Sequence, residues 1–156
     1  MSRTKKTVLI TGGASGIGLG TVKYLLNKGN YEVLSFSRGA GHIEEAKKKL
    51  GDRAQEVLFP QGDISSEADV QKLYEEIESR YGKLDGLVNS AGVMKLGGVE
   101  AQSLEEWRRV VDTNLTSVFL MVKTMLPLLK KGTNASIVNL SSLNARRPEG
   151  SAAYCA

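Results

Sequence analysis

A glycine-rich segment near the amino terminus has the composition of a phosphate-binding turn. It reads TGGASGIG over residues 11–18 and lies between a short apolar run and a helical pattern. Gly12 permits a tight turn, and Gly16 and Gly18 allow the backbone to approach a diphosphate and the helix to pack on a sheet. The N–H groups and the dipole of the helix N-terminus would face that anion. The spacing fits neither G-x-G-x-x-G nor the P-loop, because no lysine follows Gly18, so a plain strand-to-helix turn is the alternative.

Two residues at the end of the second apolar run indicate which dinucleotide would bind. NAD is usually held by an Asp or Glu about 20 residues past the glycines, which accepts a hydrogen bond from the ribose 2′-hydroxyl. This chain has Ser37 and Arg38 there. Ser37 can hydrogen-bond a 2′-phosphate and Arg38 can pair with it, whereas a carboxylate would repel it. The pattern favours NADP over NAD, and a solvated loop arginine is the alternative.

Polar and small residues also follow the other apolar runs. Asp63 could accept a hydrogen bond from an adenine amino group or could cap a turn. The segment 89–92, NSAG, would let a ligand lie close to the backbone, with Asn89 bracing the neighbouring strand, or it could be a turn. A serine pair, Ser141 and Ser142, follows the fifth run. Ligands of open α/β sheets bind beyond the carboxyl ends of the strands, so we expect all these residues to share one rim.

The elements that must position these residues alternate along the chain. The expected strands are 7–11, 32–37, 56–60, 84–89 and 136–140, and their clustered apolar residues suit strands covered on both faces. The expected helices are 16–28, 43–50, 66–81 and a longer one opened by a capping box at Ser103 and Glu106, which Pro127 ends or kinks. This alternation predicts an α/β fold with a Rossmann-like, doubly wound parallel sheet, incomplete at five strands in the order 3-2-1-4-5, forming a single domain over residues 1–156.

The composition is that of a globular domain and excludes several kinds of site. Of 156 residues, 41% are hydrophobic and 24% are charged, which is ordinary for one folded domain. The only cysteine and the only histidine, Cys155 and His42, exclude an internal disulfide and a Cys/His zinc site, and we predict no metal. A Ser-His-Asp hydrolase would need His42 as its base, but we expect His42 to be an exposed residue of a glycine-flanked loop.

Charge and hydropathy argue against membrane and nucleic-acid partners. The longest apolar runs have about five residues, far below the ~20 that cross a bilayer, and no signal-peptide core follows the basic residues 1–6. The net charge is +4, and its clusters at Arg3, Lys5 and Lys6 and at Lys47–Lys49 lack interleaved aromatics and are expected to be solvated. With the cysteine usage, these features predict a cytoplasmic protein whose partners are small molecules.

Five segments together resemble the short-chain dehydrogenase/reductase family. They are TGGASGIG at 11–18, NSAG at 89–92, DTNLTSVFL at 112–120, SIVNLSS at 136–142 and AAYCA at 152–156, where the tyrosine would open a Y-x-x-x-K motif. The resemblance implies an NADP-dependent oxidoreductase that transfers hydride between the nicotinamide and a carbonyl or alcohol substrate. The cofactor-binding residues that we predict are Gly12, Ser15, Gly16, Ile17, Gly18, Ser37, Arg38, Asp63, Ile64, Asn89, Ala91 and Gly92.

The same resemblance implies three catalytic residues. Tyr154 would be the general acid/base that protonates the substrate carbonyl oxygen, and Ser142 would orient that oxygen, with Ser141 as the second choice. Asn114 would hold a water in a proton relay.

The family's lysine falls four positions after Tyr154, past the last residue. We therefore expect the chain to be the amino-terminal portion of a longer enzyme that forms a homo-oligomer. A portion of this kind would leave the fifth strand at an uncovered edge and would lack the loop that closes over substrate. The alternative is a cofactor-binding fragment without catalysis.

Overall fold

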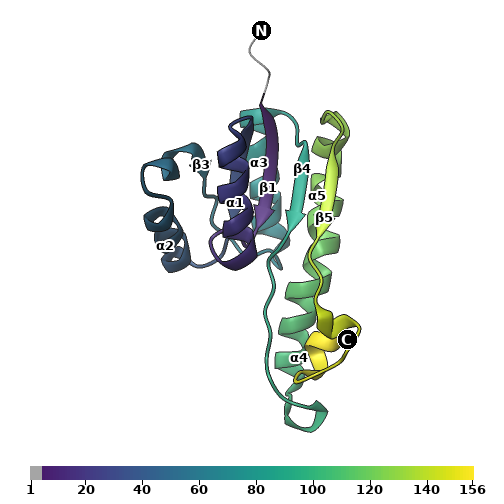
Figure 1. Cartoon of the computed structure of the whole chain (residues 1–156). Helices are drawn as coiled ribbons and strands as arrows, with labels where there is room; N and C mark the ends of the chain where they lie inside the picture. The colour runs from purple at the N-terminus through teal and green to yellow at the C-terminus, as the bar shows by residue number, and fades with distance from the viewer. Residues whose placement is uncertain (1–4) are drawn as a thin grey trace.

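The computed structural model describes residues 5–156 and contains a five-stranded parallel sheet (Figure 1). Arg3 of the amino-terminal basic cluster lies outside the described residues. The strand order is β3-β2-β1-β4-β5, which confirms the predicted doubly wound fold class. The strands are β1 (Lys6–Thr11), β2 (Tyr31–Phe36), β3 (Val57–Leu58), β4 (Gly86–Asn89) and β5 (Ser136–Asn139). β5 forms one edge, and all four of its residues are exposed.

Helices cover both faces of the sheet, as right-handed crossovers between parallel strands require. In Figure 1, α1 lies in front of the sheet and α3 lies behind it. The helices are α1 (Gly16–Lys28), α2 (Ala40–Leu50), α3 (Glu67–Tyr81), α4 (Leu104–Val111), α5 (Ser117–Lys131) and α6 (Ala152–Cys155). Short 3₁₀ turns occupy Gly51–Glu56, Val99–Ala101 and Leu143–Ala145. Across residues 5–156, none of the helices has the length and hydrophobicity that a membrane span requires.

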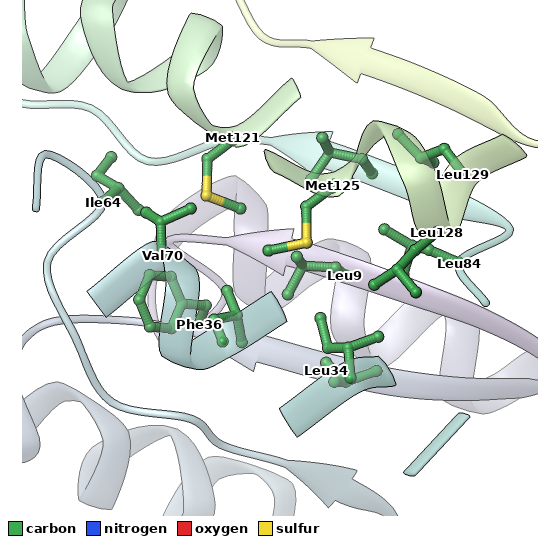
Figure 2. Close-up of a cluster of buried hydrophobic side chains, with 13 residues drawn as sticks. Leu9, Leu34, Phe36, Ile64, Val70, Leu84, Met121, Met125, Leu128 and Leu129 are labelled. Atoms are coloured by element: carbon green, nitrogen blue, oxygen red, sulfur yellow. The ribbon is translucent and has the colours of Figure 1, made fainter. Parts of the chain in front are cut away.

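Side chains along β1 alternate between the two faces of the sheet. Val8 and Ile10 join the cluster that packs against α1, and Leu9 joins the cluster that packs against α3 and α5. Figure 2 shows the second cluster, in which strand residues meet residues of both helices: Leu34, Phe36, Val70, Met121, Met125 and Leu128. Because both faces of the sheet are buried at its central strands, the sequences of those strands are continuous apolar runs.

Serine caps set the start of two helices. Ser103 Oγ accepts a hydrogen bond from Glu106 N at 3.1 Å, and the Glu106 carboxylate accepts one from Ser103 N at 3.2 Å, so the predicted capping box is present. At α3, Ser66 Oγ accepts from Asp69 N at 3.3 Å. The Asp69 carboxylate accepts instead from Asp63 N at 2.9 Å, so only half of a capping box forms and the other half holds the loop before the helix.

The structure corrects two expectations about helices. α2 begins at Ala40, so His42 lies in its first turn rather than in a loop, although it is exposed as expected. The glycines around it have low helix propensity, which hid this start in the sequence. The long helix is divided by a π-helical turn at Asp112–Thr116 and continues to Lys131, so of the two effects expected of Pro127, an end or a kink, the helix end does not occur. Met125 and Leu128, both fully buried, hold the helix through the proline.

A buried carboxylate, Asp85, ties three strand starts together at the edge opposite the predicted site. Asp85 is 3% exposed, and its oxygens accept hydrogen bonds from Thr7 N at 2.8 Å and Thr133 N at 2.7 Å. Lys83 Nζ also lies 2.9 Å from Asp85 Oδ2. Burial alone would raise the pKa of Asp85, but the bonds from Lys83, Thr133 and Thr7 outweigh it and hold the pKa below its ordinary value.

We expect Asp85→Asn to destabilise the fold by about 3 kcal/mol at neutral pH, because the amide loses the charge and presents an N–H to backbone donors. The folded-state pKa lies below the unfolded one, so the contribution is complete at neutral pH and fades as the pH falls below ~5. The gap in urea-unfolding free energy between the wild type and the variant should therefore shrink on acidification. Asp52→Asn, in an exposed turn, is the control. A gap independent of pH would contradict this account.

Candidate cofactor and active site

A pocket of about 390 Å³ lies at the carboxyl ends of β1, β2 and β4. Its wall includes every predicted cofactor-binding residue except Gly18 and Asn89: Gly12, Ser15, Gly16, Ile17, Ser37, Arg38, Asp63, Ile64, Ala91 and Gly92. The structure therefore brings together residues that lie up to 80 positions apart in the sequence. This agrees with the expected shared rim.

The glycine turn lines the pocket with backbone rather than side chains. Gly12 has φ +67°, and a Cβ there would stand 2.8 Å from the Cα of Ala91. Gly16 has φ +50°, and a Cβ there would project into open space. A Cβ on Gly18 would overlap the Gly12 carbonyl, so this glycine serves the packing of α1 against the turn. Ser15 is the N-cap of α1, and its side chain makes no capping bond, so its hydroxyl remains available to an anion.

Ser37 and Arg38 play different parts at the end of β2. The Ser37 side chain is largely buried, and its Oγ accepts a hydrogen bond from Ala14 N at 3.3 Å, which fixes the glycine turn. The guanidinium of Arg38 is exposed, and its Nη1 donates to Asp63 Oδ2 at 3.1 Å. Burial raises the pKa of Asp63, but the bonds from Ser65 and Arg38 outweigh it and lower the pKa overall. The cation at this end of the pocket is thus paired with a charged carboxylate.

Two side chains hold the ends of β1, β4 and β5 in register. Thr11 Oγ1 accepts hydrogen bonds from Ser90 N at 3.1 Å and Ala91 N at 3.2 Å. Asn89 is 5% exposed, and its Nδ2 donates to Asn139 Oδ1 at 2.8 Å. Asn89 therefore braces the neighbouring strand, as its position suggested, and does not line the pocket. Thr11 belongs to the glycine motif, but sequence reasoning assigned it no role.

A second pocket, of about 420 Å³, adjoins the first. Asn114, Ser142 and Tyr154, the three predicted catalytic residues, all line it, and so does Ser141. Both pockets share a wall made of Ile17, Ser90, Ala91, Gly92, Val93 and Leu140. The two pockets therefore adjoin along the sheet edge, and we refer to them together as the track, with Arg38 lining the first pocket and Tyr154 lining the second.

Hydrogen bonds hold the segments that carry the three predicted catalytic residues. Ser142 Oγ accepts from Asn144 N at 3.2 Å. Tyr154 is the third residue of the short α6, and its backbone N donates to Ser151 Oγ at 3.2 Å. Asn114 lies in the π-helical turn, and its side chain forms two 2.8 Å bonds with the backbone N and O of Val93. These bonds to Val93 tie the loop after β4 to the long helix, so any contact of Asn114 with water uses its remaining hydrogen-bonding capacity.

Sequence reasoning missed several residues of the first pocket, among them Gly39, His42, Gly62 and Thr113. His42 reaches the wall because α2 begins early, and nothing in its sequence neighbourhood indicated this. The presence of glycine at position 62 has a clear structural reason, because a Cβ there would stand 2.8 Å from the ring of Phe36. That contact is with a residue 26 positions away and has no local signature.

The parallel sheet, the glycine turn at its first crossover and the pockets along its carboxyl edge define an α/β protein of the Rossmann type. A family model described as short chain dehydrogenase matches residues 6–156. The chain belongs to the short-chain dehydrogenase/reductase family.

Individual relatives agree with this assignment. The chain is 36% identical over 155 residues to 2,5-dichloro-2,5-cyclohexadiene-1,4-diol dehydrogenase of Sphingobium indicum, covering 97% of this chain and 60% of the relative. It is 35% identical over 139 residues to the NADP-dependent (R)-specific alcohol dehydrogenase of Lentilactobacillus kefiri, covering 88% of this chain and 54% of the relative. A solved short chain dehydrogenase from Bacillus anthracis superposes with a TM-score of 0.84 at 28% identity, over 94% of this chain and 61% of that chain. The chain thus spans about 60% or less of the length of these relatives.

Proposed function

We propose that this chain binds NADP(H), and that the protein to which it belongs is an oxidoreductase acting on a small carbonyl or alcohol compound. The observation that carries the proposal is the track of two adjoining pockets, with the glycine turn and Arg38 lining the first and Ser142 and Tyr154 lining the second. The relative from Lentilactobacillus kefiri, whose name records NADP dependence, supports the choice of cofactor.

The residues of the first pocket fit a dinucleotide. Open space beyond Gly16, the uncapped Ser15 hydroxyl and the N-terminus of α1 suit a diphosphate. Asp63 and Ile64 would face the adenine, and Arg38 would meet the 2′-phosphate as a planar cation with several donors. Because the Ser37 side chain is largely buried and Arg38 is an exposed cation with several donors, we assign the 2′-phosphate contact chiefly to Arg38.

The residues of the second pocket suit carbonyl chemistry. When bound, the nicotinamide supplies or accepts the hydride. Tyr154 would donate a proton to the carbonyl oxygen, or remove one from an alcohol, and Ser142 would donate a hydrogen bond to the same oxygen. Asn114 would fix the loop at Val93 and hold a water for proton relay.

Arg38→Ala tests the assigned cofactor. We expect the wild-type chain to bind NADPH at least about tenfold more tightly than NADH, because a charge-assisted bond to the phosphate contributes about 1.5–3 kcal/mol. The variant should bind the two with equal affinity, measured by titration calorimetry. Arg80→Ala is the control, since Arg80 pairs with Glu76 on α3 and lines neither pocket. Equal wild-type affinities would refute the assignment of NADP.

A further inference from the structure

The ends of β2 and β3 bring Arg38 and Asp63 face to face. An isolated parallel bridge joins Ser37 to Gln61, and Gly62 N donates to Ser37 O at 3.2 Å. Gln61 Nε2 also donates to Arg38 O at 3.0 Å, so the backbone of Arg38 is fixed from the neighbouring strand. The pairing of the two strand ends therefore brings together these two charged side chains, which are 25 positions apart in the sequence.

Asp63 is held more firmly than Arg38. Asp63 Oδ1 accepts hydrogen bonds from Ser65 N at 2.9 Å and Ser65 Oγ at 2.6 Å, and Asp63 N donates to the Asp69 carboxylate at 2.9 Å. Its other oxygen, Oδ2, accepts from Arg38 Nη1. The Asp63 side chain is 29% exposed, whereas that of Arg38 is 65% exposed. The carboxylate is thus a fixed negative charge, and the guanidinium is the member of the pair that can move.

We propose that Asp63 is a specificity-determining residue that competes with the 2′-phosphate of the cofactor for Arg38. The inference rests on the proposed function, in which Arg38 meets that phosphate. A phosphate that approaches Arg38 enters the field of a carboxylate 3.1 Å from the same guanidinium, so it is repelled by one charge while it is attracted by the other. The pair therefore lowers the preference for NADPH that Arg38 alone would confer.

The ratio of the dissociation constants of NADPH and NADH isolates the effect of Asp63 on the 2′-phosphate. Any hydrogen bond from adenine to Asp63 is common to NADPH and NADH, so its loss cancels in the ratio of their dissociation constants. Only the 2′-phosphate differs between the two ligands, and it meets both the Arg38 guanidinium and the Asp63 carboxylate. The same reasoning applies to adenosine 2′,5′-bisphosphate compared with AMP, which probe this end of the track without the nicotinamide.

The test is a four-protein cycle of the wild-type chain, Asp63→Asn, Arg38→Ala and the double variant, titrated with both pairs of ligands. Asn keeps an oxygen that can accept from Ser65 and removes the charge. We expect Asp63→Asn to raise the preference for the 2′-phosphorylated ligand about fivefold, a size suited to a partly exposed ion pair. In the Arg38→Ala background the competition is absent and only direct repulsion by Asp63 remains, so the same substitution should change the ratio by a smaller factor than in the wild-type background.

The outcomes separate this inference from the proposed function. If Arg38→Ala abolishes the wild-type preference but Asp63→Asn leaves it unchanged or lowers it, the competition is refuted and the NADP assignment stands. If Arg38→Ala leaves the ratio of the two dissociation constants at its wild-type value, both the competition by Asp63 and the NADP assignment are refuted. Asp52→Asn controls for net charge, because it removes the same charge from an exposed turn outside the pocket. Asp63→Ser is measured in parallel, so that a folding defect of the Asn variant does not decide the result.

Discussion

Replacing Tyr154 with phenylalanine is expected to lower carbonyl reduction at least about a hundredfold, because positioned acid–base groups typically contribute 10²–10⁴-fold. The substitution removes one hydroxyl and keeps the ring that lines the second pocket. The backbone bond from Tyr154 N to Ser151 Oγ is independent of the hydroxyl, so α6 should keep its position. NADPH affinity should change little, since Arg38 and the glycine turn lie at the other end of the track.

Turnover is measured as NADPH oxidation by this chain with a panel of small ketones and aldehydes. Tyr74→Phe is the matched control, because its hydroxyl donates to Glu78 on α3 and lines neither pocket. Undiminished turnover in Tyr154→Phe would exclude Tyr154 as the acid. NADPH binding by a wild-type chain that shows no turnover would favour the alternative of cofactor binding without catalysis.

Replacing Gly12 with alanine is expected to destabilise the fold by about 3 kcal/mol and to abolish measurable NADPH binding. The backbone has φ +67°, which costs a residue with a Cβ about 1–2 kcal/mol. The added Cβ would also stand 2.8 Å from the backbone of Ala91, and overpacking of this kind adds about 1–3 kcal/mol. Relief requires the ends of β1 and β4 to separate, which displaces the shared wall of the two pockets.

The variant Gly29→Ala separates the cost of a positive φ from the cost of crowding against Ala91. Gly29 caps α1 with φ +72°, and a Cβ there would meet no atom within 4 Å. The Gly29→Ala variant should lose only about 1–2 kcal/mol of the free energy of unfolding, measured in urea, and should bind NADPH like the wild type. Equal losses for both variants would show that crowding against Ala91 has no energetic effect.

The succession of strands and helices along the chain and the glycine turn follow from local chemistry, and for that reason they could be predicted from the sequence. The apolar runs of the central strands are short and continuous because they are buried on both faces, and a parallel pair needs a helical crossover. The segment 11–18 is self-contained, since a tight turn leading into a helix has its requirements within a few residues. The π-helical turn and the uninterrupted helix through Pro127 were not predictable in this way, because packing of α5 against the core outweighs the local propensity.

The family resemblance supplied the residues of the second pocket, and their geometry came only with the structure. That Asn114 bonds Val93 through both ends of its amide depends on a contact across 21 positions. Ser37 was predicted as a phosphate ligand, and the further hydrogen bond that its Oγ accepts from Ala14 N depends on a contact across 23 positions.

By itself the sequence determined the order of elements, the backbone cradle and the rim on which the polar residues gather. Only the tertiary structure decided how those residues are paired: Asp63 with Arg38, and Asp85 with Thr7 and Thr133. The physical reason is that the two kinds of interaction act over different separations in the sequence. Hydrophobic period and turn chemistry act over a few residues, whereas the partner of a charged or polar side chain is selected by the neighbouring strand, 25 to 78 positions away.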